Sequence, residues 1–477
     1  MKSALPATLA HTVERLLVAG GDSRITVDPR TGRNRYGAAI RPMPDEISFA
    51  SSTASSPSVR GFEAAALMLE RVLGSADYSP AEAVRERLLA LYGIPATRCI
   101  LTPSGTDSAL LASALAGAAR RPALCIVAPA SETGSGIGLA STGCRYDPAP
   151  PFVRHAGPDS AASHFASCRY EAPALRHKHG LPIARSEYEA QIADLILDAV
   201  AKREHVVLHL LDASKTGLAP LDRAAARRLC RLAPGSVTIV VDACQLRCSS
   251  AEIRSDLAEG WFVMITGSKF AGGPPFSGAL LVPSAANIDL YDLRAVVDFS
   301  TIEDWPSEWR GYAGRLTATR NLGLLLRWQA ALAEIERFER ADLVAREECV
   351  TRFADAVRLR VAARPHLRLV AGGQPNRLDT IFTIETAGVW RAAAGAAELR
   401  NALAGSGPVR CNVGQPVAIG ASAALRVCAS MPMINEALSL VEEGVTLNRA
   451  IGPAVSQLDQ LFATWDGIVL ATRAKAS

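Results

Sequence analysis

The sequence predicts an α/β fold built around a buried, mainly parallel sheet. Residues 237–241, 261–265 and 279–282 are short apolar segments bounded by turn residues, which is the pattern of strands buried on both faces. A segment with helical spacing, 224–232, leads into the first of them in the way that a crossover helix does. We therefore expect neighbouring strands whose ends meet at one edge of a sheet, where open α/β sheets place their ligands.

Two residues with the chemistry of a cofactor site stand at the ends of these segments. Asp242 directly follows the first, and Lys269 follows the second after Thr-Gly-Ser. Pyridoxal phosphate requires a lysine amine for a Schiff base and a carboxylate that keeps its pyridine nitrogen protonated. Only six of the 51 basic residues are Lys, and Arg cannot form a Schiff base, which favours a chemical role for Lys269. For either residue alone, the alternative is an exposed lysine or a simple strand-end carboxylate.

The order of these features resembles one enzyme family. An apolar strand, Asp-x-x-Gln, a second strand and a small-residue turn before Lys are similar to the class V aminotransferase and cysteine desulfurase family, whose members are fold-type I pyridoxal-phosphate-dependent enzymes. Asp242, Gln245 and Lys269 stand at the matching positions, and the resemblance spans residues 45–440. It implies pyridoxal 5'-phosphate as cofactor and a homodimer with its sites at the subunit boundary.

The resemblance also implies how the chain is divided. A large cofactor-binding domain with a mainly parallel seven-stranded sheet would comprise residues 61–320, and a smaller α+β C-terminal domain residues 321–477. Residues 1–60 would contribute to the small domain and to the active site. The pattern at 321–364 predicts a long helix that joins the two domains.

A candidate anion site lies earlier in the chain. A strand at 99–102, a small-residue turn and a helix at 109–119 would direct unpaired N–H groups and the positive end of a helix dipole at a phosphate. Gly105 allows close backbone approach, and Thr106 adds a hydroxyl donor. The family's loop for the cofactor phosphate stands in this place. The alternative is that Ser104 or Thr106 is only an N-cap.

The resemblance assigns further cofactor contacts. They are Thr133, Ser214, Thr266, Ser268 and, toward the phosphate of a neighbouring subunit, Thr319 or Thr317. Thr133 departs from the family, which commonly has a His stacked on the pyridine ring at this position. A hydroxyl cannot stack there, so either another residue covers that face of the ring or the reaction needs no acid on it. Lys215 is a second Schiff-base candidate, ranked below Lys269 because nothing beside it pairs with Asp242.

Three residues are candidates for binding the substrate. Arg426 lies inside an apolar segment, 425–430, where an Arg is costly unless it meets a carboxylate that it can hold with two parallel hydrogen bonds. The resemblance indicates the α-carboxylate of the substrate, and a structural ion pair is the alternative. Ser52 and Thr53 follow a short strand and, by resemblance, line the same site; a plain Ser-rich turn is the alternative.

Composition argues against several classes of protein. A net charge of +4 without a basic cluster does not favour nucleic-acid binding. The sequence has neither the apolar core of a signal peptide nor a long apolar run, so we expect no membrane segment. Ten scattered Cys indicate reduced thiols in a cytoplasmic enzyme. The Pro-rich stretch 143–185 reads as an insertion or lid-like loop, and its four His lack zinc spacing, so we expect no metal.

The sequence thus favours an aminotransferase or lyase that acts at the Cα of a small amino-acid substrate. Cysteine desulfurase-type C–S cleavage is the first alternative. It needs a nucleophilic Cys before the Gln-Pro pair at 415–416, and Cys411 falls out of register. A catalytically inactive pyridoxal-phosphate-binding protein is the second alternative, against which the retention of Asp242, Lys269 and Arg426 argues.

Overall fold

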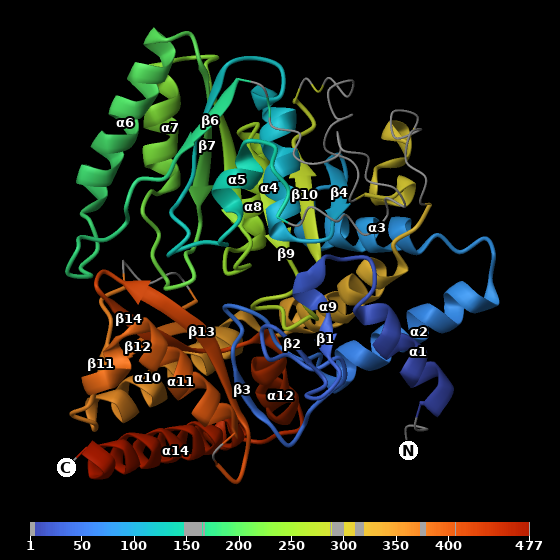
Figure 1. Ribbon diagram of the computed structural model, residues 1–477. Helices are drawn as coiled ribbons and strands as arrows, with labels where there is room; N and C mark the ends of the chain where they lie inside the picture. Colours follow the sequence, from blue (N-terminus) through green and yellow to red (C-terminus); the bar gives the residue numbers. More distant parts are fainter. Residues whose placement is uncertain are drawn as a thin grey trace.

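The computed structural model describes residues 5–146, 165, 167–286, 288, 300–310, 319–372, 378–405 and 407–476. The centre of the expected insertion at 143–185, with His155 and His164, lies outside the described residues, as does Thr317. Figure 1 shows two sheets, a large one in the upper half of the view and a smaller one below it. The candidate site lies where these two sheets meet.

The large sheet has seven strands in the order β4-β10-β9-β8-β7-β5-β6. In chain order they are β4 Arg98–Thr102, β5 Ala123–Ile126, β6 Cys168–Glu171, β7 His205–Leu211, β8 Val237–Ala243, β9 Phe262–Thr266 and β10 Gly278–Val282. β10 is antiparallel to both of its neighbours, and the pairs from β9 through β6 are parallel. The mainly parallel seven-stranded sheet predicted from the sequence is confirmed.

Both faces of this sheet are covered because its strands are apolar on both faces. Successive residues of β8 show the alternation: Val241 joins one buried cluster and Val240 the other. The first cluster contains residues of α3 Pro80–Tyr92, α6 Arg185–Ala201, α7 Arg223–Leu232 and α8 Ser250–Ala258. The second contains residues of α4 Gly105–Ser113 and α5 Ile137–Ser141. The continuous apolar runs in the sequence are thus explained by a sheet between two helical layers.

The smaller sheet has five strands in the order β11-β12-β14-β13-β3. They are β3 Ile47–Phe49, β11 Leu367–Leu369, β12 Ile381–Thr386, β13 Cys411–Ile419 and β14 Ser422–Cys428. β3 pairs in parallel with β13 (Figure 1), so the N-terminal segment is part of the C-terminal sheet. The helices beside this sheet are α10 Leu343–Ala362, α11 Ala393–Gly405, α12 Met431–Glu442, α13 Leu447–Ala450 and α14 Gly452–Ala476.

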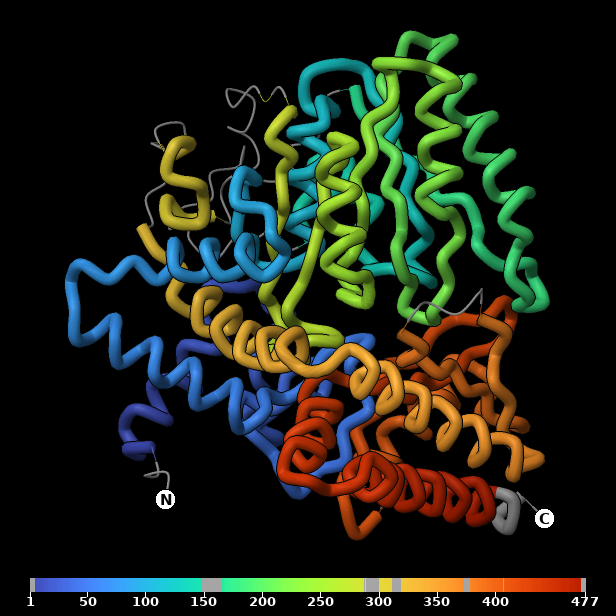
Figure 2. The backbone as a smooth tube through the Cα atoms, turned by 180° about the vertical axis from the view of Figure 1, so that it is seen from behind, coloured from blue at the N-terminus to red at the C-terminus, as the bar shows by residue number. Residues whose placement is uncertain are grey.

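The long helix expected at 321–364 is in fact two helices. α9 Leu322–Arg340 ends before Ala341, and α10 begins after Asp342, whose carboxylate accepts a hydrogen bond from the backbone N–H of Ala345. An N-cap of this kind starts a new helix, a signal that the continuous apolar spacing concealed. Figure 2 shows α9 crossing the molecule between the two sheets.

The N-terminal segment runs along the large domain before it enters the smaller sheet. It contains α1 Ala7–Leu17, a short helical turn at Ser23–Ile25, the two-stranded ribbon of β1 Val27–Asp28 and β2 Arg33–Asn34, and, after β3, α2 Val59–Gly74. Both α1 and α2 pack against α9. In the part of the chain that the structure describes, every helix is too short or too polar to cross a bilayer.

Candidate active site

A cavity of about 250 Å³ lies between the large sheet, the smaller sheet and the N-terminal segment. Most of the residues predicted for the site line it. They are Ser52, Thr53, Gly105, Thr106, Thr133, Asp242, Gln245, Thr266, Ser268, Lys269 and Arg426, together with the second lysine candidate, Lys215. Residues from four distant parts of the sequence are thus brought to one cavity.

Asp242 and Lys269 come from neighbouring parallel strands. Asp242 is the sixth residue of β8, opposite Met264 of β9, and Lys269 lies three residues beyond the end of β9. The carboxylate of Asp242 is buried and accepts a hydrogen bond of 3.1 Å from the backbone N–H of Cys244. Among the described residues Asp242 has no cationic partner in an ion pair. A buried carboxylate of this kind fits a cationic ring nitrogen, which would offset its desolvation.

The N-terminus of α4 lines the same cavity with Ser104, Gly105 and Thr106, which form the α4 cradle. Ser104 caps the helix by accepting a hydrogen bond from the N–H of Asp107, as the N-cap alternative expected, and α4 begins at Gly105. A Cβ on Gly105 would lie 2.9 Å from Sγ of Cys244 and 3.3 Å from a methyl carbon of Thr266. Packing at this point therefore requires glycine, and the cap formed by Ser104 leaves the predicted anion site possible at the same helix end.

Arg24 is a site residue that the sequence analysis missed. Its guanidinium donates hydrogen bonds of 3.3 Å to the hydroxyls of Ser104 and Thr106 and forms a bidentate pair with Asp22. It also lies 4.1 Å from the ring centroid of Tyr146. The Asp-x-Arg spacing in a turn-rich segment indicated nothing beyond a local ion pair. Only the fold, which brings residues 22–24 against the loop before α4, shows that Arg24 borders the N-terminus of this helix.

Thr133, which the sequence resemblance aligns with a ring-stacking His, lines the cavity. Its hydroxyl donates to the backbone carbonyl oxygens of Ala128 and Pro129, at 3.1 Å each. The hydroxyl is therefore committed to the turn that follows β5. Lys215 lies beside it, with Nζ 2.9 Å from the carbonyl oxygen of Thr133.

Two predicted residues do not line the cavity. Ser214 is fully buried behind its wall, and its hydroxyl donates to Oε2 of Glu132 at 2.7 Å. Glu132 does line the cavity, and its carboxylate is paired with Arg176 at 2.8 Å. Ser214 therefore positions the Glu132–Arg176 pair. Thr319 accepts a hydrogen bond from the N–H of Glu303 through its backbone carbonyl; its expected contact with a neighbouring subunit stays a prediction.

Arg426 of β14 is buried and lines the cavity from the smaller sheet. Its guanidinium donates to the hydroxyl of Thr53 at 2.8 Å, to the carbonyl oxygen of Gln415 at 2.7 Å and to that of Lys215 at 3.4 Å. These acceptors are all neutral, and the structural ion pair considered from the sequence is not formed within the described residues. Burial lowers the pKa of Arg426 to about 10, so the side chain remains cationic at neutral pH. The hydroxyl of Ser52, also buried at the cavity, has no hydrogen-bond partner.

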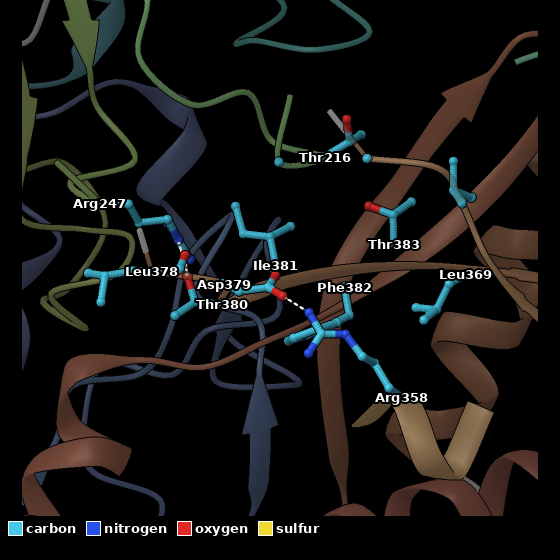
Figure 3. A pocket seen from close by; sticks show the side chains of 13 residues that line it. Thr216, Arg247, Arg358, Leu369, Leu378, Asp379, Thr380, Ile381, Phe382 and Thr383 are labelled. Atoms are coloured by element: carbon cyan, nitrogen blue, oxygen red, sulfur yellow. Dashed lines mark hydrogen bonds and ion pairs between the residues drawn. The ribbon is translucent and has the colours of Figure 1, made fainter. Parts of the chain in front are cut away.

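Gln245 is held by a residue that reaches a second cavity. Arg247 donates from Nη1 to Oε1 of Gln245 at 2.7 Å and from Nε to the hydroxyl of Thr380 at 2.6 Å. The second cavity, of about 230 Å³, lies along β12, and Arg358 points toward its ion-pair partner Asp379 there (Figure 3). None of the predicted site residues line it. The described residues contain no cluster of three or more side chains suited to hold a metal.

Comparison with known proteins shows the fold. No family model and no curated protein sequence matches the chain. The cysteine desulfurase CsdA of Escherichia coli, as its S-sulfonic acid, is 16% identical over 88% of this chain and 95% of its own, with a TM-score of 0.54. The cystine C–S lyase C-DES, in complex with its product cysteine persulfide, is 13% identical over 87% and 97%, with a TM-score of 0.55. A NifS-like protein is 12% identical over 83% and 100%, with a TM-score of 0.51. The predicted fold-type I architecture is confirmed.

Proposed function

We propose that this protein is a pyridoxal-phosphate-dependent enzyme that acts at the Cα of a small amino acid, as an aminotransferase or lyase. One observation carries the proposal. Asp242 and Lys269 extend from the ends of neighbouring parallel strands into one cavity, which also contains the N-terminus of α4. A carboxylate, a primary amine and an anion cradle are the three groups that this cofactor requires.

The residues of the cavity suit distinct tasks. The bound cofactor would supply an electron sink for negative charge at the substrate's Cα. Asp242 would hold a proton on the ring nitrogen, and the α4 N-terminus with Thr106 and Ser268 would bind the phosphate. Lys269 would carry the cofactor and, once its amine is free, take the proton from Cα. Arg426 would orient the substrate through its α-carboxylate.

Desulfurase-type chemistry through Cys411 is not favoured. Cys411 is the first residue of β13, is buried and does not line the cavity. Burial raises the pKa of its thiol to about 11, so it is a poor nucleophile at neutral pH. C–S cleavage by elimination needs no such thiol, and the likeness to a cystine C–S lyase keeps it within the proposed lyase class.

The proposal includes the assembly and the setting of the enzyme. We expect a homodimer with Thr319 of each subunit directed at the neighbouring site, and domains bounded near residues 60 and 320. All ten cysteines are free thiols, which supports a reducing compartment such as the cytoplasm.

Absorption spectroscopy tests the proposed function. Purified protein incubated with pyridoxal phosphate and then desalted should retain a visible absorption band, and amino acids should shift it. The Lys269→Ala variant should fold but lose the band. A retained band that no amine shifts would favour the inactive binding protein, and no retained band in the wild type would refute the proposal.

A further inference from the structure

We propose that the substrate carries a second anionic group on its side chain and that Lys215 binds it. This inference rests on the proposed function, because it concerns the ligand of the same cavity. It assigns Lys215 a role in specificity and narrows the substrate class from small amino acids to acidic ones.

The residues that line the cavity carry more positive than negative charge. The lining includes five cationic side chains and two anionic ones. These are Arg24, Arg35, Lys215, Lys269 and Arg426, against Glu132 and Asp242. A net excess of positive charge at a buried site favours an anionic ligand. The cofactor and the α-carboxylate of the substrate would neutralise part of this excess positive charge.

Most of these charges have an assigned partner. Arg24 is paired with Asp22 at 2.6 Å, and Glu132 with Arg176. In the proposed function, Lys269 and Asp242 bind the cofactor.

Three of the cations then remain. Arg426 would take the α-carboxylate, which leaves Arg35 and Lys215. Arg35 is exposed, so solvent screens its charge, and its guanidinium donates to the hydroxyl of Tyr146 at 3.0 Å. Of these two described cations, Lys215 is the one that is shielded from solvent, and it has no ion-pair partner among the described residues.

The geometry places this cation beside the position of the substrate. Nζ of Lys215 donates to the carbonyl oxygens of Ala130 at 2.6 Å and Thr133 at 2.9 Å, which leaves one of its three N–H groups for a ligand. The backbone carbonyl of the same residue accepts a hydrogen bond from Arg426. An amino acid held by its α-carboxylate at Arg426 thus has Lys215 as its neighbour on the side of Thr133.

The electrostatics of Lys215 agree with this role. Burial, followed by the positive charge of Arg426, lowers the pKa of Lys215 to about 8; Lys269 adds to the effect and Glu132 opposes it. The positive charges of Lys215 and Arg426 repel each other, which is destabilising. An anion bound near both side chains would offset this repulsion. The alternative role is structural: Lys215 would only tie the turn at 130–133 to the chain after β7.

Paired acids and amides distinguish these roles, because aspartate and asparagine have nearly the same shape and differ in charge. Their dissociation constants would be measured at pH 7 from the spectral change of the cofactor-loaded protein, with glutamate and glutamine as a second pair. Aspartate or glutamate should bind about tenfold or more tightly than its amide, as expected for a hydrogen-bonded charge pair. In Lys215→Met this preference should fall to about twofold or less, with the affinity for the amide retained.

Two further variants serve as controls. Arg35→Met removes the exposed cation and should change the preference less than Lys215→Met does, whereas Lys215→Arg should keep part of it. Equal affinity for acid and amide in the wild type would overturn the proposal. An equal loss for both ligands in Lys215→Met would show that Lys215 is structural. Failure of the proposed function would be seen separately, since the protein would then not retain pyridoxal phosphate before any amino acid is added.

Discussion

At the scale of single residues, the strongest indication of a ligand is a buried cation without an anion. Arg426 lies in the middle of β14 and is bonded only to neutral oxygens. Burial of such a guanidinium costs hydration free energy, and neutral oxygens offset only part of this cost. A carboxylate in the cavity would offset the remainder through two parallel, charge-assisted hydrogen bonds. The residue is therefore better explained by substrate binding than by the stability of the fold.

Replacement of Arg426 should separate substrate binding from cofactor binding. In Arg426→Met we expect the affinity for an amino acid to fall by about 10- to 100-fold, the loss of one charge-assisted contact. The affinity for pyridoxal phosphate should change by less than about threefold, since Arg426 is hydrogen-bonded to Thr53, Gln415 and Lys215 rather than to the first turn of α4. Arg410→Met is the matched control, because Arg410 precedes β13 in the same sheet and does not line the cavity. Equal losses of both affinities would show that Arg426 is structural.

The sequence alone identified polar residues at positions where burial is unfavourable unless a ligand is bound. It did not identify residues whose role depends on contacts between distant parts of the chain. A strand-end Asp, a Lys in a small-residue turn and an Arg inside a strand each violate a local preference, so they are visible in the sequence. Arg24 and the role of Ser214 are not visible, because both depend on contacts with residues about 80 positions away, Ser104 and Glu132 respectively.

At the scale of elements, the start of α4 is the most constrained point of the cavity. The helix begins against the side chains of Cys244 and Thr266, so its first turn has no room for a side chain at residue 105. The same packing holds the first turn of α4, whose N–H groups lack partners within the helix, at the wall of the cavity. The rigidity of this contact, rather than any single hydroxyl, should determine how well the cradle binds a phosphate.

Gly105→Ala should weaken both the cofactor site and the fold. The added Cβ would lie 2.9 Å from Sγ of Cys244, and relief of such a contact costs about 1–3 kcal/mol. We expect the affinity for pyridoxal phosphate to fall by about tenfold or more as α4 shifts. Gly74→Ala is the control: Gly74 ends α2 with nothing within 4 Å of an added Cβ, and this change should be neutral or slightly stabilising. Unchanged cofactor affinity in Gly105→Ala would contradict the account of the cradle.

Strands that are continuous apolar runs in the sequence were predictable. Strands that contain residues disfavoured in sheets, such as Gly and Pro, were not. The buried strands β8, β9 and β10 are continuous apolar runs in the sequence, and the structure has them within one or two residues of the predicted bounds. β13 was not predicted as a strand, since it contains Gly414 and Pro416. Its pairing with β14 shifts register between Gly414 and Val417, so a bulge accommodates residues that local propensity disfavours.

At the scale of the whole molecule, one buried arginine fixes the end of α1 to α9 and to the turn before β10. Arg327 of α9 is fully buried and donates to the carbonyl oxygens of Leu17, Ala19 and Phe276 at 2.6–3.0 Å. Phe276 lines the cavity and has a φ of 74°, a conformation that costs energy outside glycine. Arg327 thus couples the end of α1, the strained turn before β10 and the wall of the cavity.

Arg327→Met should loosen the N-terminal segment. We expect the free energy of unfolding to fall by about 3 kcal/mol or more, because several buried carbonyl groups lose their donor. Limited proteolysis should then cleave within residues 18–37 faster than in the wild type, and the affinity for pyridoxal phosphate should fall because Arg24 lies in this segment. Arg340→Met, on the exposed surface of the same helix, should change stability by less than about 0.5 kcal/mol. Similar behaviour of the two variants would refute the coupling.

We propose that Lys269, which lines the same cavity as Asp242, carries the cofactor. Borohydride reduction of the protein loaded with pyridoxal phosphate fixes the cofactor on the lysine that holds it, and mass spectrometry of the peptides identifies that lysine. We predict the added mass on the peptide that contains Lys269, and none on that peptide in Lys269→Arg. The label on Lys215 in the wild type, or on no lysine at all, would contradict the account.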